Sequence, residues 1–147
     1  MVRMTLLTVG LLGSLLAGIQ SATAASAAPL TQVNVVRVES TACGSENITE
    51  GQAQTRCDHG PDIKVYVLEI GYGREPHVEL DGFEVDGTRT QVCAFSNGAL
   101  TDCSRQSRVV GYLYTFGLAG KQSGIFTFSN TSINAPGNTL SAQLYIK

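Results

Sequence analysis

After residue 28, apolar residues recur at every second position in short runs, and no stretch has the three- to four-residue spacing of an amphipathic helix. Clusters of Gly, Asn and Pro separate these runs. Alternation at period two buries one face of a strand, so the pattern predicts an all-β chain. About eight strands in roughly 120 residues are typical of an antiparallel sandwich or barrel. We expect an antiparallel β-sandwich, immunoglobulin-like in style.

Eight runs are the candidate strands. They span residues 32–39, 63–70, 77–80, 83–85, 90–95, 107–116, 124–128 and 139–146. The run 63–70 is apolar on both faces apart from Lys64 and Glu69, which predicts a central position in a sheet. The apolar parity switches between Val35 and Val36, which indicates a bulge. Residues 40–62 read as a polar loop, and the Asp81-Gly82 pair predicts a tight hairpin.

The first 27 residues have the pattern of a secretory signal peptide. Arg3 precedes an apolar stretch of about 14 residues and a tail of small residues. Two Ala-x-Ala frames fit, so cleavage follows either Ala24 or Ala27. The apolar stretch is shorter than the roughly 20 residues of a membrane-spanning helix, and no later segment is longer. We therefore expect residues 28–147 to form one secreted, extracellular domain without a transmembrane segment.

All four cysteines lie after the expected cleavage site, and an even number in an exported chain favours two disulfides. Three pairings are possible. We prefer Cys43 with Cys57 and Cys93 with Cys103, since each pair closes a short ring rich in turn residues. Closing such a ring stabilises the fold by about 3 kcal/mol in the chain-entropy treatment. A three-residue loop at 97–99 would place the second pair directly opposite across a hairpin.

Charge and spacing argue against several functions. The formal charge is −2, and removing Arg3 with the leader leaves −3, so the cationic footprint of a nucleic-acid-binding protein is missing. A four-cysteine zinc site would need a Cys-x-x-Cys pair, which the chain lacks. The acidic residues near Asp86 do not fit the spacing of a calcium-binding EF-hand. We expect no metal and no cofactor.

Two further segments suggest a family. The segment 57–73, CDHGPDIKVYVLEIGYG, together with Pro76, the Asp81-Gly82 pair and the later segment 108–114, RVVGYLY, resembles a family of small secreted bacterial proteins typified by YolA. The resemblance would cover most of the mature chain but rests mainly on the first block. That family has no established activity, so the resemblance implies a secreted bacterial protein and assigns no catalytic residue.

The candidate chemistry lies on two loops. Asp58 and His59 stand before the 63–70 strand, and a histidine beside a carboxylate suits metal binding or acid-base catalysis. His77 follows that strand, so about 26 Å would separate the two histidines if their loops leave at opposite ends. The ordinary interpretation is that Asp58 caps a turn, His59 packs against it and His77 is a surface residue. The predicted binding residues are Asp58, His59, Asp62, Tyr72 and Arg74.

Alternating aromatic residues allow two interpretations. Tyr112, Tyr114 and Phe116 share one face of a strand, and Phe126 and Phe128 share a face of the next. Exposed, they would stack on sugars or fill a groove in a partner protein. Buried, they are the core, and we favour the core because a domain of this size needs those rings inside.

The sequence therefore predicts a binding protein that acts outside the cell on an extracellular protein or a glycan. One alternative is a small secreted hydrolase that uses Asp58, His59 and His77. Another is an extracellular toxin or competition factor that acts on membranes or envelopes. The residues alone do not identify the ligand.

Overall fold

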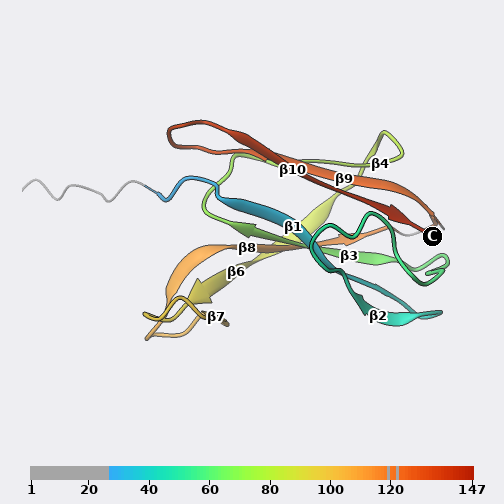
Figure 1. Cartoon of the computed structure of the whole chain (residues 1–147), viewed down its shortest axis with the longest axis horizontal. Coiled ribbons are helices and arrows are strands. Elements are labelled where there is room, and N and C mark those ends of the chain that lie inside the picture. The colour runs from blue at the N-terminus through green and yellow to red at the C-terminus, as the bar shows by residue number, and fades with distance from the viewer. Residues whose placement is uncertain (1–26, 119, 122) are drawn as a thin grey trace, which may run out of the picture.

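Two antiparallel sheets form the molecule (Figure 1). The computed structural model describes residues 27–118, 120–121 and 123–147, so the expected signal peptide lies outside the described residues except for Ala27. The larger sheet has the strand order β2-β1-β3-β8-β6-β7, and the smaller has the order β10-β9-β4-β5. The strands are β1 (Gln32–Ser40), β2 (Gly44–Asn47), β3 (Lys64–Ile70), β4 (His77–Leu80), β5 (Phe83–Glu84), β6 (Gly87–Ala94), β7 (Leu100–Thr101), β8 (Arg108–Gly117), β9 (Gly124–Thr131) and β10 (Thr139–Ile146).

The prediction of an all-β, antiparallel sandwich is confirmed. Each of the eight expected runs contains a strand, and two further strands, β2 and β7, bring the number in the described residues to ten. The expectation of a polar loop at residues 40–62 is wrong in part, because β2 lies within this segment. Its sequence, Gly-Ser-Glu-Asn, contains no apolar residue, so it has no alternation to detect. No helix in the described part of the chain is long and apolar enough to cross a membrane.

Two predicted details of the strands are confirmed. β3 lies between β1 and β8 in the larger sheet, as its apolar faces indicated. The pairing of β1 with β3 shifts register between Val35 and Arg37, where the apolar parity changes. Asp81 and Gly82 join β4 to β5 with φ values of 50° and 79°, which is the positive-φ pair of a tight hairpin turn.

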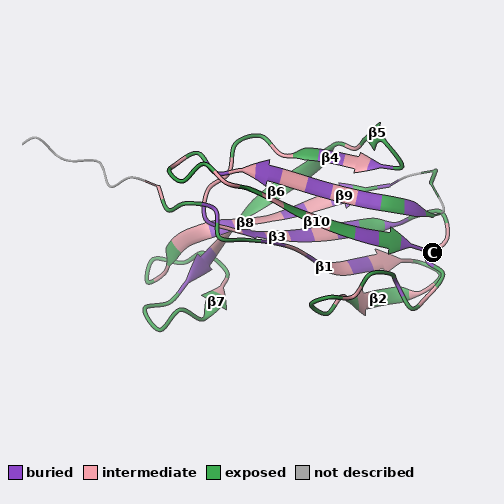
Figure 2. Cartoon of the chain, turned by 45° about the horizontal axis from the view of Figure 1, so that its top comes forward, coloured by how far each residue is buried: buried purple, intermediate pink, exposed green. Residues whose placement is uncertain are grey.

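The core lies between the two sheets (Figure 2). Tyr114 and Phe116 from β8 pack on Phe126 and Phe128 from β9, with ring centroids 5.2 Å apart for Tyr114–Phe128 and 5.5 Å apart for Phe116–Phe126. All four rings are buried, whereas Tyr112 is half-buried at the margin of the core. The aromatic row is therefore interior, as we favoured. Valine, leucine and isoleucine side chains complete the core.

Both expected disulfides are present. They join Cys43 to Cys57 and Cys93 to Cys103. The expected loop at 97–99 is wrong, because Cys93 stands opposite Thr101 and Phe95 opposite Ala99, which places the loop at residues 96–98. Gly98 explains the shift: its φ of 84° supplies the left-handed residue that ends such a loop. The second disulfide therefore joins diagonal neighbours, with 4.9 Å between their Cα atoms.

Candidate functional site

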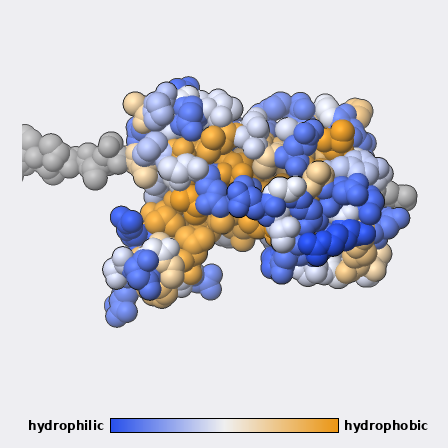
Figure 3. Space-filling model, viewed as in Figure 1, coloured by the Kyte–Doolittle hydropathy of each residue, from blue (hydrophilic) through white to orange (hydrophobic). Residues whose placement is uncertain are grey.

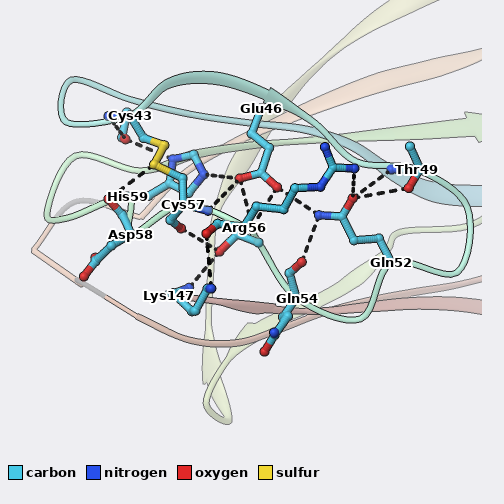
Figure 4. A network of polar contacts seen from close by, with 12 residues as sticks. Cys43, Glu46, Thr49, Gln52, Gln54, Arg56, Cys57, Asp58, His59 and Lys147 are labelled. Carbon is cyan, nitrogen blue, oxygen red and sulfur yellow. Dashed lines mark hydrogen bonds and ion pairs between the residues drawn. A yellow bond between two sulfur atoms is a disulfide. The ribbon is translucent and has the colours of Figure 1, made fainter.

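His59 lies in the loop between β2 and β3, and its side chain is fully buried (Figure 4). Its Nδ1 lies 2.9 Å from the hydroxyl oxygen of Ser40, and its Nε2 lies 3.3 Å from Oε2 of Glu46. Both ring nitrogens thus have partners within the protein. A histidine held in this way orders the loop around it and has no ring nitrogen free for a substrate.

Glu46 is the centre of that network. Its carboxylate accepts hydrogen bonds from the backbone N–H groups of Arg56 and Cys57, at 2.8 and 3.2 Å, and from Nε2 of Gln52 at 2.9 Å. Burial acts to raise the pKa of Glu46, but the hydrogen bonds from Arg56, Gln52, Cys57 and His59 together outweigh it and hold the pKa below its usual value. The network therefore depends on an ionised carboxylate.

Lys147, which follows β10, closes the same network. The backbone N–H of His59 donates to the carbonyl oxygen of Lys147 at 2.8 Å, and the N–H of Lys147 donates to Oγ1 of Thr55 at 3.0 Å. Thr55 is itself fully buried. These bonds attach the loop 53–59 to the end of β10 and serve the stability of the fold.

Asp58 and Asp62 differ from their expected roles. Asp58 is exposed, whereas Asp62, also exposed, accepts hydrogen bonds from the backbone N–H of Thr41 at 3.1 Å and from its hydroxyl. Those hydrogen bonds from Thr41 lower the pKa of Asp62. The turn-capping role that we expected for Asp58 is thus performed by Asp62, on the turn at residues 41–43.

The structure does not bring His59 and His77 together. His77 is exposed on β4, where its Nε2 contacts Oε1 of Glu79 at 2.8 Å. It pairs with Ser129, which pairs with Ser141 on β10, whereas His59 bonds to Lys147 at the far end of β10. Ser141 and Lys147, which directly follows β10, are six residues apart, which corresponds to about 20 Å. Asp58, His59 and His77 therefore share no site in this structure.

Three donor groups in the loop network lie close enough to suggest a metal site. Ligand atoms of Cys43, Glu46 and His59 all fall within 4.8 Å of one another. However, the sulfur of Cys43 is bonded to Cys57, so it is not the thiolate that binds metals, and Glu46 already contacts His59. The arrangement is better explained as a disulfide-linked structural cluster.

The other predicted loop borders a cleft. Tyr72 is half-buried, with its hydroxyl donating to the carbonyl oxygen of Val109 at 3.1 Å, and Arg74 is exposed. Arg74 lies at the mouth of a cleft of about 550 Å³ between β6 and β8 on one side and residues 73–78 on the other. We call this the β6 cleft. Its walls are Gly73, Arg74, Glu75, Pro76, Val78, Val85, Asp86, Gly87, Thr88, Arg89, Tyr114 and Phe116.

The length of β5 produces the cleft. β5 has two residues, whereas β6 in the larger sheet has eight. The smaller sheet therefore ends before it can cover the inner face of β6. Glycines allow the remaining walls to approach closely, since a Cβ at Gly87 would lie 2.4 Å from the ring of Phe116.

A buried carboxyl group lies directly behind the β6 cleft. Glu69 is fully buried, and its Oε2 accepts a hydrogen bond from Nδ2 of Asn130 at 2.7 Å. Its Oε1 lies 3.5 Å from the hydroxyl of Tyr114, which lines the cleft. Burial raises the pKa of Glu69 despite these hydrogen bonds and the nearby charge of Arg89. Buried titratable groups beside a cleft are common at functional sites.

Arg89 supplies the charge that faces this carboxyl group. Its guanidinium lies 4.4 Å from the centre of the Tyr112 ring, which is a cation–π contact. Interaction with Tyr114 and Glu69 raises the pKa of Arg89, so the side chain is a permanent cation at the cleft. The cleft thus combines aromatic and aliphatic walls with fixed charges, which suits a ligand that is both apolar and polar.

A second, smaller cleft lies on the opposite side of the sandwich. It has a volume of about 300 Å³ and lies between β1 and β10, where Figure 3 shows apolar surface. Val33, Val35, Ile48 and Leu144 line it, with Glu50 as its one charged residue among the described positions. It lacks the convergence of charged groups found in the β6 cleft.

Sequence reasoning missed Glu46, Arg89 and the role of Tyr114. No feature of the sequence indicated Glu46, because β2 contains no alternation of apolar and polar residues. Glu69 was detectable, because it shares the parity of Val65 and Val67 and therefore the core face of β3.

The chain was compared with known protein families and with curated proteins. The family described as "Domain of unknown function (DUF4879)" matches residues 24–146. No curated protein matches the chain.

Proposed function

The chain belongs to the DUF4879 family of domains of unknown function, and we propose that it is a secreted, extracellular binding protein whose ligand occupies the β6 cleft. The leader at residues 1–27 supports export, and two disulfides are consistent with an oxidising, extracellular compartment. The resemblance to YolA-like proteins supports a bacterial source.

One observation carries the choice of site. Charged side chains of both signs line the β6 cleft beside apolar walls, and the buried carboxyl group of Glu69 lies behind it; the charged lining residues are Arg74, Glu75, Asp86 and Arg89. The loop at 58–62, our other expected binding surface, has its histidine fully buried and both ring nitrogens occupied. Recognition by the Gly73–Pro76 loop on a rigid sheet also agrees with the usual place of binding residues.

The function is tested by retention of the mature protein on intact bacteria, cell-wall polysaccharide and culture supernatant proteins. We expect retention on one of these fractions. The double variant Arg74→Ala and Arg89→Leu should reduce it at least about tenfold, as expected when two charged contacts are lost.

The matched control is the double variant Arg105→Ala and Arg108→Leu, which removes the same charge from exposed positions outside the cleft. Circular dichroism verifies that both variants retain the β fold. Retention on no fraction, or an equal effect of the two double variants, would contradict a binding function in this cleft.

A further inference from the structure

β6 has one paired edge and one free edge. β8 pairs with it from Gly87 to Ala94, whereas β7 pairs only with Cys93 and Ala94 on the other side. Along residues 87–92, no other strand of the described chain lies on that second side. These residues are exposed except for Val92, which is half-buried. A sheet edge of this length can accept an added strand.

The pairing of β8 with β3 shows which backbone groups of β6 are free. The N–H of Gly71 donates to the carbonyl oxygen of Val110, and the N–H of Leu118 donates to that of Ile63, each at 2.8 Å. Even-numbered residues of β8 therefore bond to β3. In an antiparallel sheet the bonding direction alternates along a strand, so the odd-numbered residues of β8 bond to β6.

The partners of those odd-numbered residues on β6 follow from the register. They are Thr88, Thr90 and Val92, opposite Thr115, Leu113 and Gly111. The backbone groups of Gly87, Arg89 and Gln91 consequently point away from β8, toward the free edge. The N–H and C=O groups of three alternate residues thus face outward. Their spacing matches that of the N–H and C=O groups of an extended peptide.

Two of these residues, Arg89 and Gln91, direct their side chains to the inner face of the sheet, and Arg89 also lines the β6 cleft. Arg89 pairs with Tyr114 and Gln91 with Tyr112, so their side chains lie on the inner face of the sheet. A strand added along this edge would turn every second side chain to that inner face, beside the cleft walls. The edge therefore extends the β6 cleft into a site for main chain and side chains together.

We propose that the ligand is an extended peptide segment of another protein, which adds to β6 along residues 87–91 and places an acidic side chain beside Arg89. This inference rests on the proposed function and specifies its ligand. Backbone bonds to Arg89 and Gln91 would hold the peptide, and the β6 cleft would select its side chains.

The charge of Arg89 decides between possible occupants. An inward-pointing charge on an edge strand opposes pairing with neutral strands, because the added strand would remove water from the guanidinium, which lies near Glu69 but forms no salt bridge with a described residue. Antiparallel pairing of two copies centred at this residue would place Arg89 opposite Arg89, which is unfavourable. A peptide with a carboxylate at that position removes both costs and is therefore favoured.

The test compares two variants of one residue. Gln91→Pro removes the outward N–H and leaves the ladder with β8 intact, whereas Gln91→Thr changes the side chain and keeps the N–H. The probe is a displayed library of random heptapeptides, selected on immobilised wild-type mature protein. We expect enriched peptides to alternate in polarity and to contain an acidic residue, and their binding to fall at least about tenfold in Gln91→Pro but not in Gln91→Thr.

Amide hydrogen exchange supplies a second readout. Binding of an enriched peptide should slow exchange at the N–H groups of Arg89 and Gln91 in the wild type. The proposal is overturned if no peptide is enriched, if enriched peptides bind Gln91→Pro equally well, or if the free edge instead joins two copies in a dimer that Gln91→Pro abolishes.

The two proposals fail in distinguishable ways. If retention on a cellular fraction depends on Arg74 and Arg89 but is the same in Gln91→Pro and Gln91→Thr, the cleft binds a ligand that is not an added strand. If retention depends on none of these residues, the cleft itself is not the binding site.

Discussion

Asn130 donates a hydrogen bond from Nδ2 to Oε2 of Glu69 over 2.7 Å, and both side chains are buried between the sheets. Asn130 also donates to the carbonyl oxygen of Arg74 at 3.1 Å. A Cβ at Gly73 would lie 2.2 Å from Nδ2 of Asn130, so the glycine is needed for this approach. The buried carboxyl group and the loop that borders the β6 cleft are thus joined through one amide.

The pKa of Glu69 predicts a dependence of stability on pH. Burial raises this pKa, so the folded protein holds the proton more tightly than the unfolded chain. The stabilising contribution is fully present below the unfolded-state pKa and is lost as pH rises through the folded-state pKa. Glu69→Gln removes this loss. The free energy of unfolding of the variant, compared with that of wild type at the same pH, should therefore increase by on the order of 1 kcal/mol between pH 4 and pH 8.

Urea unfolding at the two pH values measures this gain. Glu75→Gln serves as the control because Glu75 is exposed at the rim of the same cleft. A difference between wild type and Glu69→Gln that stays constant with pH would show that burial does not perturb the carboxyl group.

Glu46 should behave in the opposite sense. Its pKa is lowered, since hydrogen bonds outweigh its burial, so its contribution is present above the unfolded-state pKa and is lost as pH falls through the folded-state value. Glu46→Gln leaves fewer acceptors for the N–H groups of Arg56 and Cys57. We expect a loss of about 1–3 kcal/mol at pH 7 and a flatter profile on the acid side.

Thermal and urea unfolding from pH 3 to pH 7 check this profile. The exposed neighbour Glu50, changed to Gln, should leave it unchanged. An acid-sensitive profile that persists in Glu46→Gln would contradict the role of this carboxylate.

The strands were largely readable from the sequence because burial follows their period. Glu69 on the valine face of β3 and the bulge after Val35 are examples. The strand that carries Glu46 was less readable, because β2 has no apolar residue. The short β5 was expected at 83–85, but its sequence does not show that the smaller sheet ends there beside β6 and leaves a cleft.

The histidines illustrate the same limit. Sequence alone placed His59 near a carboxylate, but it suggested Asp58, its neighbour along the chain. The actual partner is Glu46, 13 residues earlier, which the pairing of β2 with β1 brings beside His59. Contacts of this kind depend on tertiary packing and leave no periodic signal.

Two glycines of β8 form a matched pair for a packing test. A Cβ at Gly111 would lie 1.9 Å from the carbonyl oxygen of Glu69, whereas a Cβ at Gly117 would meet nothing within 4 Å. Gly111→Ala must displace the backbone of β3, so we expect a loss of at least about 3 kcal/mol, and Gly117→Ala should stay within about 0.5 kcal/mol of wild type. Melting temperatures measure both, and similar values for the two variants would contradict the close contact of β3 with β8.

The two disulfides should differ in their coupling to Glu46. Their rings have sequence separations of 14 and 10, so replacing either pair with Ser should cost a similar amount, about 3 kcal/mol. Only the Cys43–Cys57 disulfide adjoins the network, because Glu46 accepts a hydrogen bond from the N–H of Cys57.

Neighbouring sites are non-additive, whereas distant sites add. Combining Glu46→Gln with loss of the Cys43–Cys57 disulfide should therefore cost at least about 0.5 kcal/mol less than the sum of the separate losses, since each change already loosens the same loop. Combining it with loss of the Cys93–Cys103 disulfide should give the simple sum. Unfolding free energies of the single and combined variants measure both couplings. Equal couplings would mean that the network around His59 does not depend on its disulfide.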